Sequence, residues 1–311
     1  MIATRDAYGK VLAELGAQNE RIVALSADLA KSTKVDDFAK KFPDRFFQTG
    51  VAEANMTDIA AGLAACGKIP FVSSFCVFST GRAWEMVRNT IGYGRLNVKI
   101  VGTHGGISVG ADGSSHQATE DIALMRVIPG MTVIVPADGP ETERAIRAVA
   151  AMTGPVYVRL GRAKVPTVSR PEDGFTIGKG IALKNGKDLT IVACGALVSP
   201  ALQAAETLAA EKISAAVVNL HTIKPIDTQL ILKMAEETGA FVTAEEHQIM
   251  GGLGGAVCET LARVRPIPVE MVGIDDRFGQ SGEPDELFRE YGLEAKDIVA
   301  AAHRVLERKP R

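Results

Sequence analysis

Short apolar runs alternate along the chain with longer segments rich in Ala, Glu, Arg and Leu. Runs of this length predict strands, and the segments between them predict helices. Regular alternation of the two predicts a mostly parallel sheet with helices on both faces. In the first half of the chain the expected strands are residues 21–26, 70–75, 98–103, 131–137 and 154–160.

The alternation stops in the middle of the chain and then restarts. Residues 163–180 contain two prolines and three glycines, which is typical of a linker. A chain of 311 residues is long enough for two domains. We therefore expect an α/β domain at 1–165, a linker at 166–185 and a smaller α/β domain at 186–311. Strands of the second domain are expected at residues 188–194, 214–220, 239–245 and 267–273.

Composition narrows the class of protein. Hydrophobic residues make up 46% of the chain and charged residues 23%, with 35 basic against 37 acidic side chains, so a globular protein without a nucleic-acid partner is expected. The four cysteines lie far apart without a CxxC pair, which predicts reduced thiols and no metal ligands. No secretory signal or membrane-spanning apolar run is visible, and we expect a cytoplasmic protein.

The richest candidate loop follows the expected strand 98–103. Ligands gather at the carboxyl ends of parallel strands, and here "THGGISVGADGSSHQATED" places His104, Asp112 and His116 among glycines and serines. Such backbone freedom is costly unless something must approach closely. The alternative is a surface loop with incidental histidines, which composition alone leaves open.

Two further stretches each allow two interpretations. Glu53 lies between an apolar run and a helix of small residues, either for chemistry or because the helix dipole favours a carboxylate there. Phe75 and Phe78 end a strand and could be core residues or a platform for a flat heterocycle. The chain lacks a dinucleotide fingerprint, a Walker loop, an HExxH motif and a GxSxG elbow, which argues against a nicotinamide dehydrogenase and a serine hydrolase.

Taken together, these stretches resemble one family. "TGVAEANM", "FCVF", "GTHGGISVGADGSSHQATED" with "MRVIPGMTVIVPAD", and "VYVRLGR" occur in the order seen in the pyrimidine-binding domain of transketolases. The rest of the chain resembles the transketolase C-terminal domain. A weaker resemblance extends to deoxyxylulose-phosphate synthases and to the beta subunits of 2-oxoacid dehydrogenases.

The resemblance implies a cofactor site. Glu53 matches the catalytic glutamate that hydrogen-bonds the ring nitrogen N1′ of the aminopyrimidine of thiamine diphosphate, and its small apolar neighbours suit that role. Phe78 would stack on the aminopyrimidine and Phe75 would line its pocket. A Tyr commonly follows the second Phe by three residues, whereas this chain has Gly81, so the pocket wall is expected to be more open or filled by a neighbour.

A sugar site is implied as well. Asp112 matches the residue that binds substrate hydroxyls, and His116 matches the histidine at the reacting carbonyl, where a proton must be moved. Arg5, Ser26, His104 and Arg162 match positions that hold the sugar phosphate, for which guanidinium groups are well suited.

One family motif is missing. Transketolases hold the metal and the cofactor's diphosphate with a GDG motif in an N-terminal domain, and these 311 residues contain no GDG. The chain is therefore expected to be the C-terminal subunit of a split transketolase, with no metal ligands of its own. An N-terminal subunit would hold Mg²⁺ and the diphosphate, in a dimer of heterodimers.

The expected reaction is transfer of a two-carbon ketol unit from a ketose phosphate to an aldose phosphate. The alternatives are the corresponding half of a deoxyxylulose-phosphate synthase or a 2-oxoacid dehydrogenase, and a scaffold that kept the fold without the chemistry.

Overall fold

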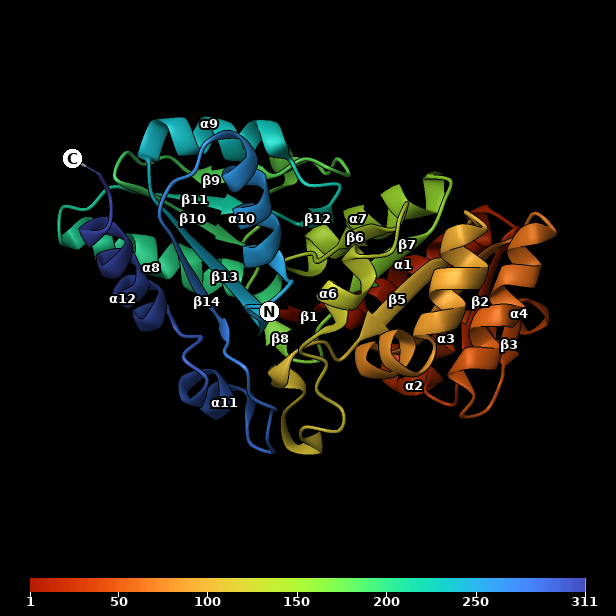
Figure 1. Ribbon diagram of the computed structural model, residues 1–311. Helices are drawn as coiled ribbons and strands as arrows, with labels where there is room; N and C mark the ends of the chain where they lie inside the picture. The colour runs from red at the N-terminus through yellow and green to blue at the C-terminus, as the bar shows by residue number, and fades with distance from the viewer. Residues whose placement is uncertain (311) are drawn as a thin grey trace.

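All nine apolar runs contain a strand in the computed structural model, which describes residues 1–310. They build two sheets, each with helices on both faces (Figure 1), so the predicted α/β class is confirmed. The first sheet consists of β2 (Ile22–Ser26), β3 (Phe46–Gln48), β4 (Ile69–Phe75), β5 (Lys99–Thr103), β6 (Thr132–Ile134), β7 (Val156–Arg159) and β12 (Thr222–Lys224). The second consists of β9 (Ile181–Lys184), β10 (Leu189–Ala193), β11 (Ala215–Asn219), β13 (Phe241–Gln248) and β14 (Val269–Ile274).

The first sheet has the order β12-β6-β7-β5-β4-β2-β3, and every neighbouring pair is parallel except β12 with β6. Different apolar clusters cover the two faces of this sheet. Successive residues of β2 point to opposite faces, so Ile22 packs with one cluster and Val23 with the other. The elements of this half are α1 (Thr4–Gln18), α2 (Ala30–Thr33), α3 (Asp36–Lys41), α4 (Glu53–Ala65), α5 (Trp84–Met86), α6 (Asp121–Arg126), α7 (Gly139–Ala151), and two π-helical segments, Phe78–Arg82 and Val87–Tyr93.

The second sheet has the order β14-β13-β10-β11-β9, with only β9 antiparallel. Strand β9 falls inside the stretch predicted as a linker. Apolar residues of α8 and α12 pack together with one face, and those of α9 and α10 with the other. The helices of this half are α8 (Val198–Ala210), α9 (Thr228–Thr238), α10 (Leu253–Val264), α11 (Pro284–Glu290) and α12 (Ala295–Glu307).

The two halves share contacts that a simple division of the chain does not predict. Strand β12 comes from the stretch assigned to the second domain but pairs with β6 of the first sheet. One apolar cluster runs from Met56 of α4 to Leu253 and Val257 of α10. A small antiparallel pair joins β1 (Ile2–Ala3) to β8 (Lys164–Val165). Arg311, the last residue of the predicted second domain, lies outside the described residues.

Within residues 1–310, no helix has the length and apolar character needed to cross a membrane.

Candidate active site

The carboxyl ends of the first sheet open onto a cavity with a strongly basic wall. Its volume is about 330 Å³. Four of its lining residues carry a cationic side chain and one carries a carboxylate, so the cavity favours an anion. The lining residues are Arg5, Lys31, Ser32, Lys34, Phe75, His104, Asp112 and Arg162.

His104 forms the floor of this cavity directly after β5. Its φ of 60° places a non-glycine residue in the left-handed region. The Nε2 atom lies 3.0 Å from an Arg5 guanidinium nitrogen and Nδ1 lies 2.8 Å from Thr103 Oγ1. Because a guanidinium only donates, Nε2 must accept and the ring proton must sit on Nδ1. Burial, with the nearby Arg5 and Arg162, lowers the pKa of His104 to about 3, so the ring is neutral.

The two arginines of the cavity are held from different elements. Arg5, in the first turn of α1, also donates to the Ser32 carbonyl at 3.1 Å. Its Nε is buried and meets no acceptor within the described chain. Arg162 follows β7, contacts the Val109 carbonyl and lies 3.7 Å from Asp112. Both guanidinium groups therefore reach the cavity from fixed backbone positions.

The loop carrying Asp112 and His116 is braced by the second half of the chain. The Ser108 amide donates to Glu246 Oε1 at 2.6 Å. Gly106 has a φ of 80°, and a Cβ there would lie 2.3 Å from the Glu246 carboxyl group. Only glycine allows this close approach. The loop's position thus depends on a carboxylate at the end of β13.

A buried ion pair at the end of the same loop also holds it in place. Arg159 Nε lies 2.8 Å from Asp121 Oδ2, and the Tyr157 hydroxyl donates to that oxygen at 2.5 Å. Arg159 also donates to the Glu246 carbonyl at 2.8 Å and the Ala118 carbonyl at 3.2 Å. Sequence reasoning did not single out this network, although its arginine and aspartate lie within the motifs that carried the resemblance.

The rings of Phe75 and His104 line the cavity, and those of Phe78 and His116 lie beside them as an aromatic wall. Phe75 and Phe78 lie with their ring centroids 5.8 Å apart and their planes 13° apart. The His104 ring stacks on Phe75 at 3.7 Å, and the His116 ring meets Phe78 edge-on at 5.4 Å. His116 Nδ1 lies 2.9 Å from the Ser115 hydroxyl. The structure therefore brings both predicted phenylalanines and both loop histidines into one group.

Glu53 begins α4 and is only 3% exposed. Its position is as buried as its apolar neighbours suggest, but its carboxylate also has a cationic partner. An Arg82 guanidinium nitrogen lies 3.3 Å from Glu53 Oε1. The same guanidinium lies over the Phe78 ring, 4.4 Å from its centroid. Arg82 links Glu53 to the aromatic wall, and sequence reasoning assigned it no role.

The Ser26 side chain makes a local contact at the end of its strand. Ser26 ends β2 on the correct edge of the sheet, but its buried hydroxyl accepts from the Leu29 amide at 3.2 Å. In the described part of the chain it does not line the cavity. The cavity is lined instead by Lys31, Ser32 and Lys34, which follow the same strand. In the sequence, the pattern "KSTK" shortly after the strand could have indicated them.

Comparison with known proteins places this site in a family. The family described as "Transketolase, pyrimidine binding domain" matches residues 1–167, and that described as "Transketolase, C-terminal domain" matches residues 178–298. The chain belongs to the transketolase family. The predicted fold, family and enzyme class are thereby confirmed.

Its relatives include separate transketolase C-terminal chains. A Methanocaldococcus jannaschii protein, provisionally designated a transketolase C-terminal section, is 50% identical over 306 residues, covering 97% of this chain and 95% of that protein. A 6-deoxy-6-sulfo-D-fructose transketolase subunit of Clostridium sp. strain MSTE9 is 46% identical over 305 residues, covering 98% and 95%. A solved structure titled as a split gene transketolase, inactive beta4 tetramer, has a TM-score of 0.93, 54% identity and full coverage of both chains.

Gly81, where transketolases commonly carry a Tyr, leaves the aromatic wall open. A Cβ built there meets no heavy atom of the described residues within 4 Å. The adjacent Arg82, rather than a side chain at Gly81, covers the Phe78 face.

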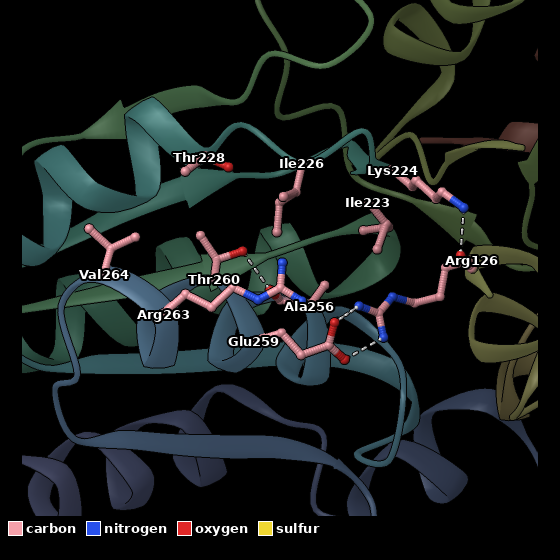
Figure 2. A pocket seen from close by; sticks show the side chains of 10 residues that line it. All are labelled: Arg126, Ile223, Lys224, Ile226, Thr228, Ala256, Glu259, Thr260, Arg263 and Val264. Atoms are coloured by element: carbon pink, nitrogen blue, oxygen red, sulfur yellow. Dashed lines mark hydrogen bonds and ion pairs between the residues drawn. The ribbon is translucent and has the colours of Figure 1, made fainter. Parts of the chain in front are cut away.

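A second cavity, of about 380 Å³, lies between α10 and β12, away from the predicted site residues (Figure 2). Its cations are largely committed to structure. Arg126 makes two hydrogen bonds to Glu259, at 3.0 and 2.7 Å. Lys224 Nζ donates to the carbonyls of Arg126 and Ile128, at 2.8 and 2.6 Å. These contacts join the first half of the chain to the second. The cavity is therefore not assigned to transketolase chemistry.

Proposed function

We propose that the chain is the C-terminal subunit of a split, thiamine-diphosphate-dependent transketolase. In this proposal it moves a two-carbon ketol unit from a ketose phosphate to an aldose phosphate. The observation that carries it is the basic cavity walled by Phe75 and His104, with the buried Glu53 carboxylate nearby at Phe78.

The residues present fit the aminopyrimidine end of the cofactor. Phe78 offers a ring face for stacking, Phe75 lies beside it, and Glu53 is a buried carboxylate that can exchange a proton with a ring nitrogen. When bound, the cofactor supplies the carbanion chemistry, while protein groups orient it. Glu53 is accordingly proposed as the residue that holds and moves the activating proton.

The diphosphate end is proposed to belong to another polypeptide. Among residues 1–310, no three or more His, Cys, Asp or Glu side chains are grouped so that they could hold a metal ion. Mg²⁺ with a diphosphate needs oxygen ligands, and the proposal assigns these to an N-terminal subunit. We further propose two copies of each subunit, because oligomers favour closed two-fold symmetry.

The substrate end follows from the cavity. Arg5 and Arg162 would bind the phosphate, with the neutral His104 fixing Arg5 through its Nε2 acceptor. Asp112, more than a third exposed, would accept from sugar hydroxyls. His116, beside the aromatic wall, would transfer a proton at the reacting carbonyl. Ser26 keeps a place in this proposal only through its backbone position on the sheet edge.

A pyruvate-using enzyme is the second candidate, since deoxyxylulose-phosphate synthases and 2-oxoacid dehydrogenases share the two domains. The four cations of the cavity favour a phosphorylated donor, because pyruvate carries a single carboxylate. The scaffold alternative is disfavoured because Glu53, His104, Arg162 and the aromatic pair lie together in one region. Comparing a ketose phosphate with pyruvate as donor separates the two enzymes.

The test of the proposal uses the chain alone and with its N-terminal subunit. Thiamine diphosphate and Mg²⁺ are titrated calorimetrically, and we expect tight binding only to the pair. Glu53→Gln keeps the size of the side chain but removes its proton transfer, so ketol transfer by the pair should fall about 10²- to 10⁴-fold. Glu85→Gln, at an exposed position in α5, is the matched control and should retain activity. Full activity of Glu53→Gln would contradict the proposal.

A further inference from the structure

Arg82 makes two contacts that concern the same small region. Its guanidinium lies 4.4 Å from the centroid of the Phe78 ring. It also lies 3.3 Å from one oxygen of Glu53 and 3.4 Å from the other. The Arg82 side chain remains 55% exposed, whereas that of Glu53 is 3% exposed. A half-exposed cation therefore covers a buried carboxylate and an aromatic face at once.

These are the two contacts that the aminopyrimidine needs. A guanidinium is flat and presents N–H donors in its plane, so it can stack on a ring and donate to a carboxylate simultaneously. An aminopyrimidine is also flat, and its ring nitrogen shares a proton with the carboxylate. The two groups thus compete for Phe78 and for Glu53, since one ring face cannot hold both.

The local backbone explains how Arg82 reaches this position. Phe78–Arg82 is π-helical, and such segments accommodate an extra residue and are frequent at functional sites. Gly81 beside it leaves open space within the described structure. Because its neighbour adds no side chain and Arg82 itself is half exposed, the guanidinium has room to leave without disturbing the core.

We propose that Arg82 occupies the place of the cofactor's aminopyrimidine in the free chain and is displaced when the cofactor binds. This inference rests on the proposed function. Pairing with Arg82 spares Glu53 from being a buried carboxylate without a partner, which is costly. The cofactor must break this pairing, so Arg82 weakens its binding and reduces occupation of the site by other flat ligands.

The experiment compares cofactor affinity in the assembled pair. Thiamine diphosphate is titrated calorimetrically, with Mg²⁺ in excess, into pairs containing the unmodified chain, Arg82→Ala, Arg82→Lys or Arg88→Ala. Arg82→Ala should lower Kd about three- to thirtyfold, the combined worth of an exposed ion pair and a cation–π contact. The Kd of the Arg82→Lys pair should lie between those of the unmodified and Arg82→Ala pairs, because lysine keeps the charge but lacks the planar guanidinium. Arg88, exposed in the following π-helical segment, is the matched control and should leave Kd unchanged.

A second measurement uses the full chain without its partner. The probe is 4-amino-2-methylpyrimidine, followed by ligand-observed NMR, and Arg82→Ala should bind it more tightly than the unmodified chain. Arg82→Gln replaces Arg82→Ala in both measurements if the alanine variant does not fold. An unchanged or higher Kd for thiamine diphosphate in the variants overturns the inference.

Failure of the inference is distinguishable from failure of the proposed function. If the unmodified pair binds cofactor and loses activity with Glu53→Gln, but Arg82→Ala binds no more tightly, only the role of Arg82 is wrong. If the unmodified pair does not bind thiamine diphosphate at all, both fall together.

Discussion

Both sheets are mostly parallel with helices on both faces, but the side chains at the carboxyl ends of their strands play different roles. In the first sheet, Phe75 ends β4 while His104 and Arg162 follow β5 and β7, and all three line the cavity. In the second sheet, the carboxyl groups at the end of β13 accept hydrogen bonds from backbone amides. Glu245 accepts from the Leu253 and Gly254 amides, at 2.6 and 2.8 Å, where α10 begins. A parallel arrangement of strands therefore locates a candidate edge, and the side chains there that lack a partner within the protein decide whether ligands bind.

The electrostatics of the two edges differ in the same sense. Burial raises the pKa of Glu245 and of Glu246. The hydrogen bonds that their carboxyl groups accept from backbone amides partly offset this rise. At the first edge, Arg5 and His104 share one hydrogen bond, and Arg5 retains a buried donor. The first edge is built to receive an anion, whereas the second is built to hold the loop that carries Asp112 and His116.

Removing a cation from the first edge should have the largest effect. Arg162→Ala deletes a charge-assisted donor that we propose for the phosphate, so KM for a ketose phosphate should rise about ten- to hundredfold. The same ketose without its phosphate should show little change. Initial rates of the assembled pair with both sugars measure this difference.

Lys164 provides the control for Arg162. It is an exposed cation two residues later and outside the set that lines the cavity in the described chain. Lys164→Ala should leave both values of KM unaltered. Equal losses for the two sugars with Arg162→Ala would show that the residue shapes the loop and does not bind phosphate.

Loosening the brace at the second edge should have a smaller effect, visible first in stability. Glu246→Ala leaves the buried Ser108 amide without its acceptor, which costs about 1–3 kcal/mol of unfolding free energy. Glu246→Gln keeps an acceptor oxygen and should lose less. Denaturant unfolding of both variants, with KM of the pair, checks this, and identical stability of the two would argue against the brace.

Much of this comparison could be predicted from the sequence. Apolar runs located nine strands because burial on both faces of a parallel sheet demands such runs. The rule that ligands gather at carboxyl ends of strands then led to the loop after residue 103 and to His104, which the structure places in the cavity.

The remaining features depend on tertiary structure. Strand β12 is only three residues long, and it pairs with β6 of the other predicted domain. No local pattern in the sequence therefore predicts it. Lys31 and Lys34 enter the cavity only because the turn after β2 folds toward Arg5. Arg82 resembles any exposed helical cation until a π-helical turn brings it over Phe78. Each of these depends on contacts between segments that are far apart in the sequence, which periodicity does not encode.

An effect that appears only as a pH dependence of stability should come from Glu141, which joins α7 to the end of β11 at the second edge. Its carboxylate accepts from the Ala137 amide at 2.6 Å and from Asn219 Nδ2 at 2.8 Å, yet burial raises its pKa to about 7. Between the unfolded pKa of about 4.3 and that value, the native state holds a proton that the unfolded chain has released. The free energy of unfolding should therefore fall as pH rises across this window.

Glu141→Gln removes this titration at nearly constant shape. Its oxygen can still accept from Ala137, and a turned Asn219 amide would give its new NH₂ group the Oδ1 atom, which otherwise has no partner in the described chain. Denaturant unfolding at pH 5 and pH 8 should show the variant gaining on the unmodified chain at pH 8, by roughly 2–3 kcal/mol. Glu143→Gln, on the same helix but paired with Lys10 at the surface, should show no such gain. An equal response of both variants to pH would place the titrating group elsewhere, and the second edge would then carry an ionised acid in the native state.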